Sequence, residues 1–332
     1  MQHHMLLLLL LILTSQHFIP SSSLSQKCDR YEKIYLLNIK DELGNPPQLS
    51  SWNPATDCCE EWLGVVCETH GVMADGTYME IYTINRLDLS NLDLPQPLPI
   101  PPSIINLDFL ITLSFNRIPN LIGSIPPFFV ALPKLEHLFI QYTNISGEIP
   151  YYLSKMKSLV GITLTHNKLT GTLPDTLPSL PNLNGIAFND NQLTGPIPKS
   201  YGSFSSSFRV LSLSRNRLSG KIPASLAKLN LTVVDLSSNK LGGDASVFFG
   251  SKKRTEYILL ARNSFAFDIG KVGLPKNLKW LDLSNNKIFG ILPNELMKLK
   301  HLSKLNVSNN NLSCGEIPEA ENSEMFEEAC RI

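Results

Sequence analysis

The sequence predicts an α/β repeat fold, a solenoid with a parallel sheet on its concave face, and three observations predict it. One frame of apolar residues recurs at near-constant spacing along most of the 332 residues. The six cysteines fall only before and after this repeated body. The chain is also apolar enough to bury a large core, since 43% of its residues are hydrophobic and 17% are charged. A disordered chain is excluded, and the balance of 29 basic and 29 acidic residues gives no long-range reason to bind nucleic acid.

Residues 1–25 have the composition of a secretory signal peptide. They contain no charged residue, and residues 5–13 form a run of nine apolar residues. Such a run suits the apolar core of a signal peptide but is too short for a membrane span. The usual positive residue near the N-terminus is missing, which leaves a buried helix as the alternative. We therefore expect a secreted mature protein without a membrane span.

The cysteines favour disulfides over a metal site. No cysteine or histidine spacing suits zinc, and an even number of cysteines clustered at the ends of a secreted chain is typical of disulfide bonds. The adjacent Cys58 and Cys59 can hardly pair with each other. The connectivity that we prefer is Cys28–Cys58, Cys59–Cys67 and Cys314–Cys330.

The repeated frame is Leu-x-x-Leu-x-Leu-x-x-Asn-x-Leu, the pattern of a leucine-rich repeat. Its asparagine recurs at spacings of 23 to 25 residues, at Asn167, Asn191, Asn216, Asn239, Asn263, Asn286 and Asn310. Extended backward, the frame places Thr143, Ile118 and Leu92 in the same position and predicts about ten units of 24 residues. A second signature, Gly-x-[Ile/Leu]-Pro, follows most of these positions and predicts a rigid turn on the outer wall.

Each unit is expected to add one short strand to a leucine-rich-repeat solenoid. In the segment x-x-Leu-x-Leu-x-x alternate residues point to opposite faces, so the leucines enter the core and the residues between them face solvent. One unit cannot bury its apolar face alone, whereas stacked units share a core and bring their strands to about 4.8 Å. The asparagine amide can then satisfy backbone groups of neighbouring turns, which makes these asparagines structural.

Both ends of a solenoid need a cap. We expect residues 26–83 to form a disulfide-stapled N-terminal cap, in which Trp52 and Trp62 cover the first repeat. A helix is expected over Tyr31–Lys40, with an apolar stripe through Ile34, Leu37 and Ile39. The expected solenoid and C-terminal cap are residues 84–313 and 314–332.

Several motifs are more specific than the general repeat. They are Leu36-Leu-x-Ile-Lys40, Ser51-Trp52, Thr56-Asp-Cys-Cys59, Gly243-Asp-Ala-Ser-Val247, Ala266-Phe-Asp-Ile-Gly-Lys-Val-Gly-Leu274 and Leu305-Asn-Val-Ser308. With them, essentially the whole mature chain resembles the plant polygalacturonase-inhibiting proteins. The resemblance implies a protein of the plant cell wall and apoplast that binds fungal or insect endo-polygalacturonases and limits pectin degradation.

The resemblance is weakest at the C-terminus. Members of that family usually have eight cysteines, four of them near the end, whereas only Cys314 and Cys330 stand there in this chain. The second C-terminal disulfide of the family therefore cannot form here.

The solvent-facing strand positions form the expected recognition surface, because curvature makes the sheet a long concave platform. Phe139, Tyr257 and Trp280 at such positions are typical of interface anchors, although they could instead pad a twisted sheet. By resemblance, the enzyme-facing positions of the middle strands are Thr163, Asn184, Val210, Asp235 and Glu256.

Acidic residues on this surface would complement basic residues around the cleft of a partner enzyme. The whole expected partner-binding set is His137, Phe139, Gln141, Thr163, His166, Asn184, Asp190, Val210, Ser212, Asp235, Glu256, Tyr257, Trp280 and Asp282.

Catalysis is not expected. His166, Asp190 and Ser214 end consecutive strands, but an open platform offers neither an oxyanion hole nor a pocket that excludes water. Side chains on a rigid sheet diverge, so His137, His166 and Asp190 predict no metal site, and we expect no cofactor.

Three functions stay open. The first is an enzyme inhibitor that acts as a monomer, with pectin as a second candidate ligand. The second is a non-inhibitory recognition module for a peptide, a pectin fragment or a receptor partner, and the third is an ice-binding protein.

Four sequons mark acceptor sites for N-linked glycans in a secreted chain. Asn144 and Asn230 are expected in loops between a strand and the outer wall, where modification is favoured. Asn306 is expected on a strand, where a glycan would obstruct the last part of the concave face. The four acceptors are Asn144, Asn230, Asn306 and Asn311.

Overall fold

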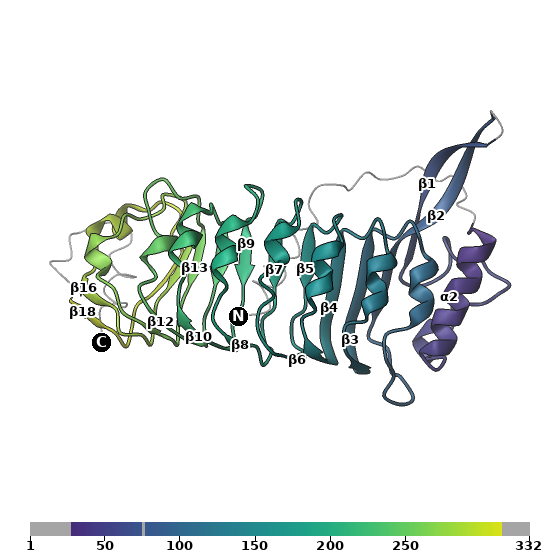
Figure 1. The fold of residues 1–332 in the computed structure, drawn as a ribbon, viewed down its shortest axis with the longest axis horizontal. Coiled ribbons are helices and arrows are strands. Elements are labelled where there is room, and N and C mark those ends of the chain that lie inside the picture. Colours follow the sequence, from purple (N-terminus) through teal and green to yellow (C-terminus); the bar gives the residue numbers. More distant parts are fainter. Residues whose placement is uncertain (1–27, 75–76, 314–332) are drawn as a thin grey trace.

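The structure is a computed structural model, and it describes residues 28–74 and 77–313. The chain forms an elongated, curved solenoid, with strands along one side and short helices along the other (Figure 1). The predicted leucine-rich-repeat fold is confirmed. The expected signal peptide (1–25), the C-terminal cap (314–332) and the bridge Cys314–Cys330 lie outside the described residues.

The helix α2 (Arg30–Glu42) covers the N-terminal end of the solenoid. It begins at Asp29, whose side chain accepts hydrogen bonds from two backbone N–H groups of the first turn. The predicted stripe through Ile34 is wrong, because Ile34 is 48% exposed. The face toward the core instead comprises Glu32, Leu36 and Ile39.

Aromatic stacking and two disulfides hold the cap together. The buried rings of Trp52 and Trp62 stack with their centroids 5.4 Å apart. The predicted bridges Cys28–Cys58 and Cys59–Cys67 are both present, so this part of the predicted connectivity is confirmed. A short 3-10 helix, η1 (Pro47–Leu49), follows α2.

The strands β1 (Val65–Ala74) and β2 (Thr77–Ser90) form an antiparallel hairpin that projects from the body (Figure 1). The end of β2 then pairs in parallel with β3 (Thr112–Gly123). One strand thus belongs both to the cap and to the first repeat, and the boundary expected at residue 83 falls inside it. The repeat pattern did not predict this hairpin.

The remaining strands of the main sheet are parallel and follow chain order. Each repeat supplies one of them, as the frame predicts. They are β4 (His137–Glu148), β5 (Gly161–Thr163), β7 (Gly185–Ala187), β9 (Val210–Ser212), β11 (Val233–Asp235), β13 (Tyr257–Leu259), β15 (Trp280–Asp282) and β17 (Lys304–Asn306).

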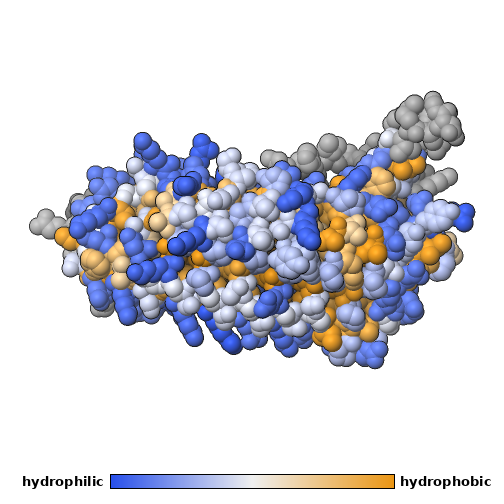
Figure 2. All heavy atoms as spheres, viewed as in Figure 1, coloured by the Kyte–Doolittle hydropathy of each residue, from blue (hydrophilic) through white to orange (hydrophobic). Residues whose placement is uncertain are grey.

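Short 3-10 helices form the convex side. They are η2 (Pro102–Asn106), η3 (Pro127–Ala131), η4 (Tyr151–Lys155), η5 (Leu177–Ser179), η6 (Lys199–Ser203), η7 (Ala224–Lys228), η8 (Ser246–Phe248), η9 (Ile269–Lys271) and η10 (Asn294–Lys298). Figure 2 shows apolar side chains gathered toward the cap, whereas polar side chains dominate the rest of this view.

Smaller parallel sheets connect the strands of the concave face to the helices. A four-stranded sheet comprises β8 (Thr194–Gly195), β10 (Arg217–Lys221), β12 (Lys240–Gly243) and β14 (Ser264–Phe265), and β16 (Phe289–Ile291) pairs with β18 (Asn311–Ser313). The strand β6 (Lys168–Thr170) pairs with the end of β4 instead. A left-handed glycine precedes the helical side in most repeats. Gly195, with φ of +75°, is one example, and a side chain there would approach Thr172.

The frame asparagines act as predicted, by joining one repeat to the next. The Oδ1 atom of Asn216 accepts a hydrogen bond from Leu193 N–H at 3.0 Å. Its Nδ2 atom donates to the carbonyl oxygens of Phe188, Leu213 and Ser214. Asn167, Asn191, Asn239, Asn263, Asn286 and Asn310 make equivalent bonds.

The residue before each frame position has a left-handed backbone. The φ angles lie between 53° and 57° at Asn91, Arg117, Tyr142, His166, Asp190, Arg215, Ser238, Arg262, Asn285 and Asn309. This conformation turns the chain out of the sheet and is uncommon for residues other than glycine and asparagine. It aligns ten side chains along one edge of the concave face.

Candidate partner-binding face

Equivalent residues of neighbouring repeats lie side by side across the concave face. Val233, for example, pairs with Val210 on one side and with Tyr257 on the other. Each frame position therefore forms a row perpendicular to the strands. We define the first row as His137, Gly161, Gly185, Val210, Val233, Tyr257, Trp280 and Lys304, and the second row as Phe139, Thr163, Ala187, Ser212, Asp235, Leu259, Asp282 and Asn306.

The first row carries an apolar cluster that is separate from the main core. Val210 and Val233 are buried, and the half-buried Tyr257 packs against them. The half-buried Trp280 follows in register on β15. The ammonium of Lys304 lies 4.4 Å from the centroid of the Trp280 ring, a cation–π contact that ends the row.

An ion pair borders this cluster at the residues that precede Tyr257 and Trp280. The Lys279 Nζ atom lies 2.7 Å from the Glu256 Oε2 atom, and both side chains are partly exposed. The hydrogen bond to Glu256 raises the pKa of Lys279, while partial burial opposes that rise. The expected set included Glu256 but missed Lys279 and Lys304, which occupy the same frame positions as Glu256 and Trp280 one repeat later.

The second row is less exposed than the sequence analysis expected. Phe139 is 5% exposed, so its description as an exposed aromatic is wrong. Thr163, Ser212 and Asp235 are buried as well, although they lie on the concave face as predicted. The reason is geometric, since strands one sheet spacing apart on a concave surface bring their side chains together and each side chain covers its neighbour.

Each acid of the second row accepts hydrogen bonds from the serine two residues further along the chain. Asp235 Oδ1 accepts from the backbone N–H and the hydroxyl of Ser237 at 3.1 and 2.7 Å. Asp282 accepts two equivalent bonds from Ser284. Burial raises the pKa of Asp235, and the bonds from Ser237 and Ser214 oppose that rise. Asp235 is 3% exposed, so it cannot present an open carboxylate to a basic partner.

Five of the ten left-handed edge positions, from Arg117 to Arg215, form a continuous ladder of side-chain contacts. The Arg117 guanidinium lies 5.8 Å from the Tyr142 ring centroid, and that ring stacks on His166 at 4.1 Å. Asp190 continues the ladder, with its Oδ2 atom 3.4 Å from His166 Nε2 and its Oδ1 atom 2.6 Å from Arg215 Nε. Two expected site residues, His166 and Asp190, are thus brought into direct contact.

Several buried polar atoms on the concave face have no hydrogen-bond partner among the described residues. They are His137 Nδ1, Asn184 Oδ1, Asn189 Oδ1 and Ser212 Oγ. Burial lowers the pKa of His137, which keeps its ring neutral at lower pH than usual. Gln141 differs from these residues, because it donates to Thr165 Oγ1 at 3.1 Å. Buried polar groups are ordinarily satisfied, so these atoms are suited to accept bonds from water or from a bound partner.

The four sequons have different surroundings. Asn144 lies on the strand β4, so its expected position in a loop is wrong. It is half-buried, and its Nδ2 atom donates to Pro119 O at 2.6 Å. Asn230 is exposed, and its Oδ1 atom accepts from Arg254 N–H at 3.2 Å. Asn306 lies on β17, at the C-terminal end of the second row, and Asn311 lies on β18.

In the ranges 28–74 and 77–313, no helix combines the length and apolar character that a membrane crossing requires.

Comparisons with known proteins agree with this architecture. A family model described as "Leucine rich repeat N-terminal domain" matches residues 30–68, and models of the leucine-rich repeat match residues 207–229, 227–245, 277–299 and 301–322. Among solved structures, a plant ice-binding protein is 36% identical, with a TM-score of 0.83 over 92% of this chain and 94% of that one.

A second solved structure is the ectodomain of the receptor kinase GASSHO1/SCHENGEN3 from Arabidopsis thaliana, in complex with CASPARIAN STRIP INTEGRITY FACTOR 2. It is 31% identical, with a TM-score of 0.62 over 86% of this chain and 36% of that one. Among curated proteins, polygalacturonase inhibitor 1 of Phaseolus vulgaris is 57% identical over 288 residues, which are 86% of this chain and 82% of the relative. The chain therefore belongs to the polygalacturonase-inhibitor family of leucine-rich-repeat proteins.

Proposed function

We propose that the protein is a secreted plant protein that binds endo-polygalacturonases of fungi or insects and inhibits them without being an enzyme itself. The names of its relatives support the target, since the Phaseolus vulgaris relatives at 55–57% identity are named polygalacturonase inhibitors. The signal-like composition of residues 1–25 and the two disulfides support an extracellular site of action in the apoplast.

The observation that carries the proposal is the apolar cluster of the first row. Aromatic residues that are partly exposed and flanked by charges are typical of the centre of a protein–protein interface. Tyr257 and Trp280 meet that description, with the ion pair of Glu256 and Lys279 beside them. A protein partner would cover the aromatic rings and leave the paired charges at its rim.

A reducing-sugar assay tests the proposal directly. Purified protein is added to a panel of endo-polygalacturonases from fungi and insects, with demethylated pectin as substrate. We expect the rate of sugar release to fall for at least one enzyme, with competitive kinetics. Full activity of every enzyme at a large excess of the protein would overturn the proposal.

Substitutions on the first row test the face. We expect Tyr257→Ala and Trp280→Ala each to weaken binding at least tenfold, because truncation of an aromatic anchor typically costs more than about 2 kcal/mol. Phe289→Ala is the matched control, since Phe289 is an exposed aromatic of β16, away from the concave face. Surface plasmon resonance measures the affinity of each variant for a susceptible endo-polygalacturonase. If Phe289→Ala loses affinity while Tyr257→Ala and Trp280→Ala keep it, the assignment of binding to the concave face is wrong.

Two other functions have support of their own. The GASSHO1/SCHENGEN3 ectodomain shares the fold and was solved with a bound factor, so a recognition module for a peptide, a pectin fragment or a receptor is the first alternative. Ice binding is the second, through the likeness to the plant ice-binding protein. Exposed charged residues such as Glu148 and Lys168 interrupt the hydroxyl residues of the paired strands β4 and β6, which disfavours a regular ice-matching array. Thermal hysteresis without enzyme inhibition would favour ice binding over our proposal.

A further inference from the structure

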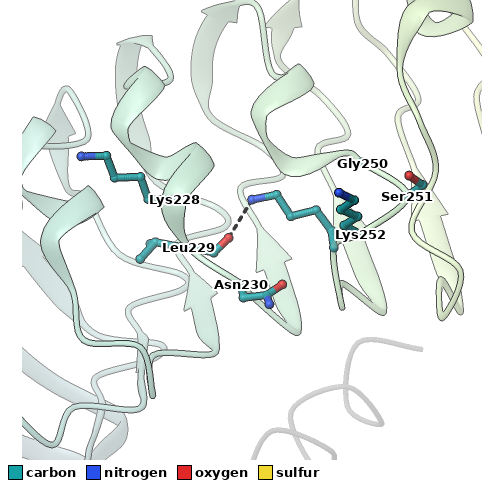
Figure 3. Close-up of a pocket in the computed structure, with 7 residues that line it drawn as sticks. Lys228, Leu229, Asn230, Gly250, Ser251 and Lys252 are labelled. Atoms are coloured by element: carbon teal, nitrogen blue, oxygen red, sulfur yellow. Dashed lines mark hydrogen bonds between the residues drawn. The ribbon is translucent and has the colours of Figure 1, made fainter.

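A hollow of about 410 Å³ lies on the molecule between the ends of η7 and η8 (Figure 3). Residues 228–230, which lead from η7 to β11, form one side, and residues 250–253, which lead from η8 to β13, form the other. Ligand pockets commonly measure about 300 to 1,000 Å³. The hollow is at the lower end of that range, which suits one or two sugar rings.

A lysine holds the two sides together. The Lys253 ammonium donates hydrogen bonds to the carbonyl oxygen of Leu229, at 2.8 Å, and to that of Ala227. Figure 3 marks the bond to Leu229 with a dashed line. Burial lowers the pKa of Lys253. Because this side chain spans the two segments, the shape of the hollow is fixed by the fold and does not depend on a ligand.

Asn230 lines the hollow and begins the sequon Asn230-Leu-Thr232. Its Oδ1 atom accepts the backbone N–H of Arg254, the residue after the second side of the hollow. This bond fixes the plane of the amide and leaves the Nδ2 atom for other chemistry. An N-linked sugar is attached at Nδ2, so the bond from Arg254 survives modification.

We propose that Asn230 carries an N-linked glycan and that the first N-acetylglucosamine of this glycan occupies the hollow. The proposal depends on the secretion inferred above, but not on inhibition. In the transfer, a bond forms between Nδ2 and C1 of the sugar, and the bond between C1 and a phosphate oxygen of a lipid-linked pyrophosphate oligosaccharide breaks. The lipid pyrophosphate leaves, and Nδ2 loses one proton.

The lining of the hollow suits an uncharged sugar with many acceptors. Lys252 is exposed and supplies N–H donors for the acetamido carbonyl and hydroxyl oxygens of the ring, whereas Lys228 extends away from it (Figure 3). Gly250 has no side chain and leaves one wall open, and Ser251 adds a hydroxyl. A seated sugar would therefore cover the exposed Lys252.

The other sequons lack this arrangement. Asn144, Asn306 and Asn311 lie on the strands β4, β17 and β18, and the amide nitrogen of Asn144 already donates to Pro119. None of these three asparagines lines the hollow. Asn230 is therefore the acceptor for which the fold provides a seat.

Mass spectrometry and amine labelling test the proposal together. The full chain is expressed with its own N-terminal segment in a plant secretory host, and glycopeptides are mapped. We expect Asn230 to be occupied in most molecules. With N-hydroxysuccinimide acetate as the probe, we expect Lys252 to be acetylated at least threefold more slowly in the glycosylated protein than in Asn230→Gln or Thr232→Ala.

Two controls separate the sugar from the substitution. Thr232→Ser keeps the sequon and should protect Lys252 as the wild type does, and the exposed Lys168 on β6 should be labelled equally in all forms. A bare Asn230 in the secreted protein would overturn the proposal, and so would a glycan that leaves the labelling of Lys252 unchanged. Inhibition is measured separately on the same samples, so a protein that carries the seated glycan but fails to inhibit would refute only the proposed function.

Discussion

Among single side chains, Glu32 has unusual surroundings. It lies on the buried face of α2, where its Oε2 atom accepts the backbone N–H of Ile84 at 2.8 Å. Burial raises the pKa of this carboxyl from 4.5 to about 7, an effect that the bond from Ile84 opposes and the charges of Asp29 and Asp108 increase. The cap therefore contacts the first repeat through a carboxyl group that favours its protonated form.

Glu32→Gln should remove a pH dependence of stability. The folded state holds the proton of Glu32 more tightly than the unfolded state does, so the free energy of unfolding should fall as the pH rises from about 4.5 to about 7. Glutamine keeps the acceptor for Ile84 without the charge. We expect the variant to match the wild type near pH 4.5 and to exceed it by about 3 kcal/mol at pH 8. Urea denaturation at the two pH values measures the free energy of unfolding. An equal change between the two pH values in both proteins would contradict the prediction.

The frame asparagines give a second prediction for a single side chain. Asn216→Ala removes the acceptor of the buried Leu193 N–H and the three hydrogen bonds that the Asn216 amide donates to carbonyl oxygens. The hydrogen bonds by which this side chain joins two neighbouring repeats are then lost. We expect a loss of about 2 to 3 kcal/mol in the free energy of unfolding, since an unsatisfied buried backbone group costs about 1 to 3 kcal/mol. Asn182→Ala, at an exposed turn position, should change it by less than about 0.5 kcal/mol. Similar effects of the two substitutions would argue against this role of the frame asparagines.

The sequence predicted the asparagines well and the concave side chains less well, for a physical reason. A frame asparagine satisfies backbone groups that every repeat presents, so its role follows from the pattern alone. The exposure of Phe139 or Asp235 depends instead on the side chains beside it on neighbouring strands. A pattern within one repeat contains no such information.

Among the secondary-structure elements, the repeated strands were predictable and the hairpin of β1 and β2 was not. The strands of the main sheet from β3 to β17 each contain apolar positions of the frame, whereas β1 lies outside it. The available signal was an Asp75-Gly76 dipeptide, which is typical of a hairpin turn between alternating segments. The helix α2 was predicted, but its stripe was placed wrongly because a buried Glu32 does not count as apolar.

The cap should depend on its longer disulfide. Cys28–Cys58 closes a loop of 30 residues, which corresponds to about 3.5 kcal/mol in the chain-entropy model. We expect the double variant Cys28→Ser/Cys58→Ser to melt at lower temperature and to exchange amide hydrogens faster across residues 28–110 before the middle repeats are affected. Stability passes between neighbouring repeats only, so the change should fade along the chain. Unchanged exchange in residues 28–110 would contradict this prediction.

The solenoid as a whole presents one curved face whose charges are largely paired within the protein. The formal net charge is zero. Glu256 pairs with Lys279, Asp190 pairs with His166 and Arg215, and Asp235 is buried against its serine. The sequence suggested an acidic surface that complements basic residues around the cleft of a partner enzyme. Such a surface requires carboxylates that are exposed and not paired within the protein. Shape and aromatic contact must therefore contribute more to recognition than long-range attraction does.

Association with a susceptible endo-polygalacturonase should accordingly depend weakly on salt. Without electrostatic steering, association rate constants are typically about 10⁵ to 10⁶ M⁻¹s⁻¹, and we expect a fall of less than about tenfold between about 50 and about 500 mM salt. Asp235→Asn should leave the association rate unchanged, because that carboxylate is 3% exposed and already accepts two bonds from Ser237. Glu256→Gln, which opens the ion pair with the partly exposed Lys279, is the matched variant and should alter the salt dependence. Stopped-flow measurements at several salt concentrations give the association rate constants of the wild type, Asp235→Asn and Glu256→Gln. A steep salt dependence that Asp235→Asn abolishes would restore the acidic-surface model and overturn this one.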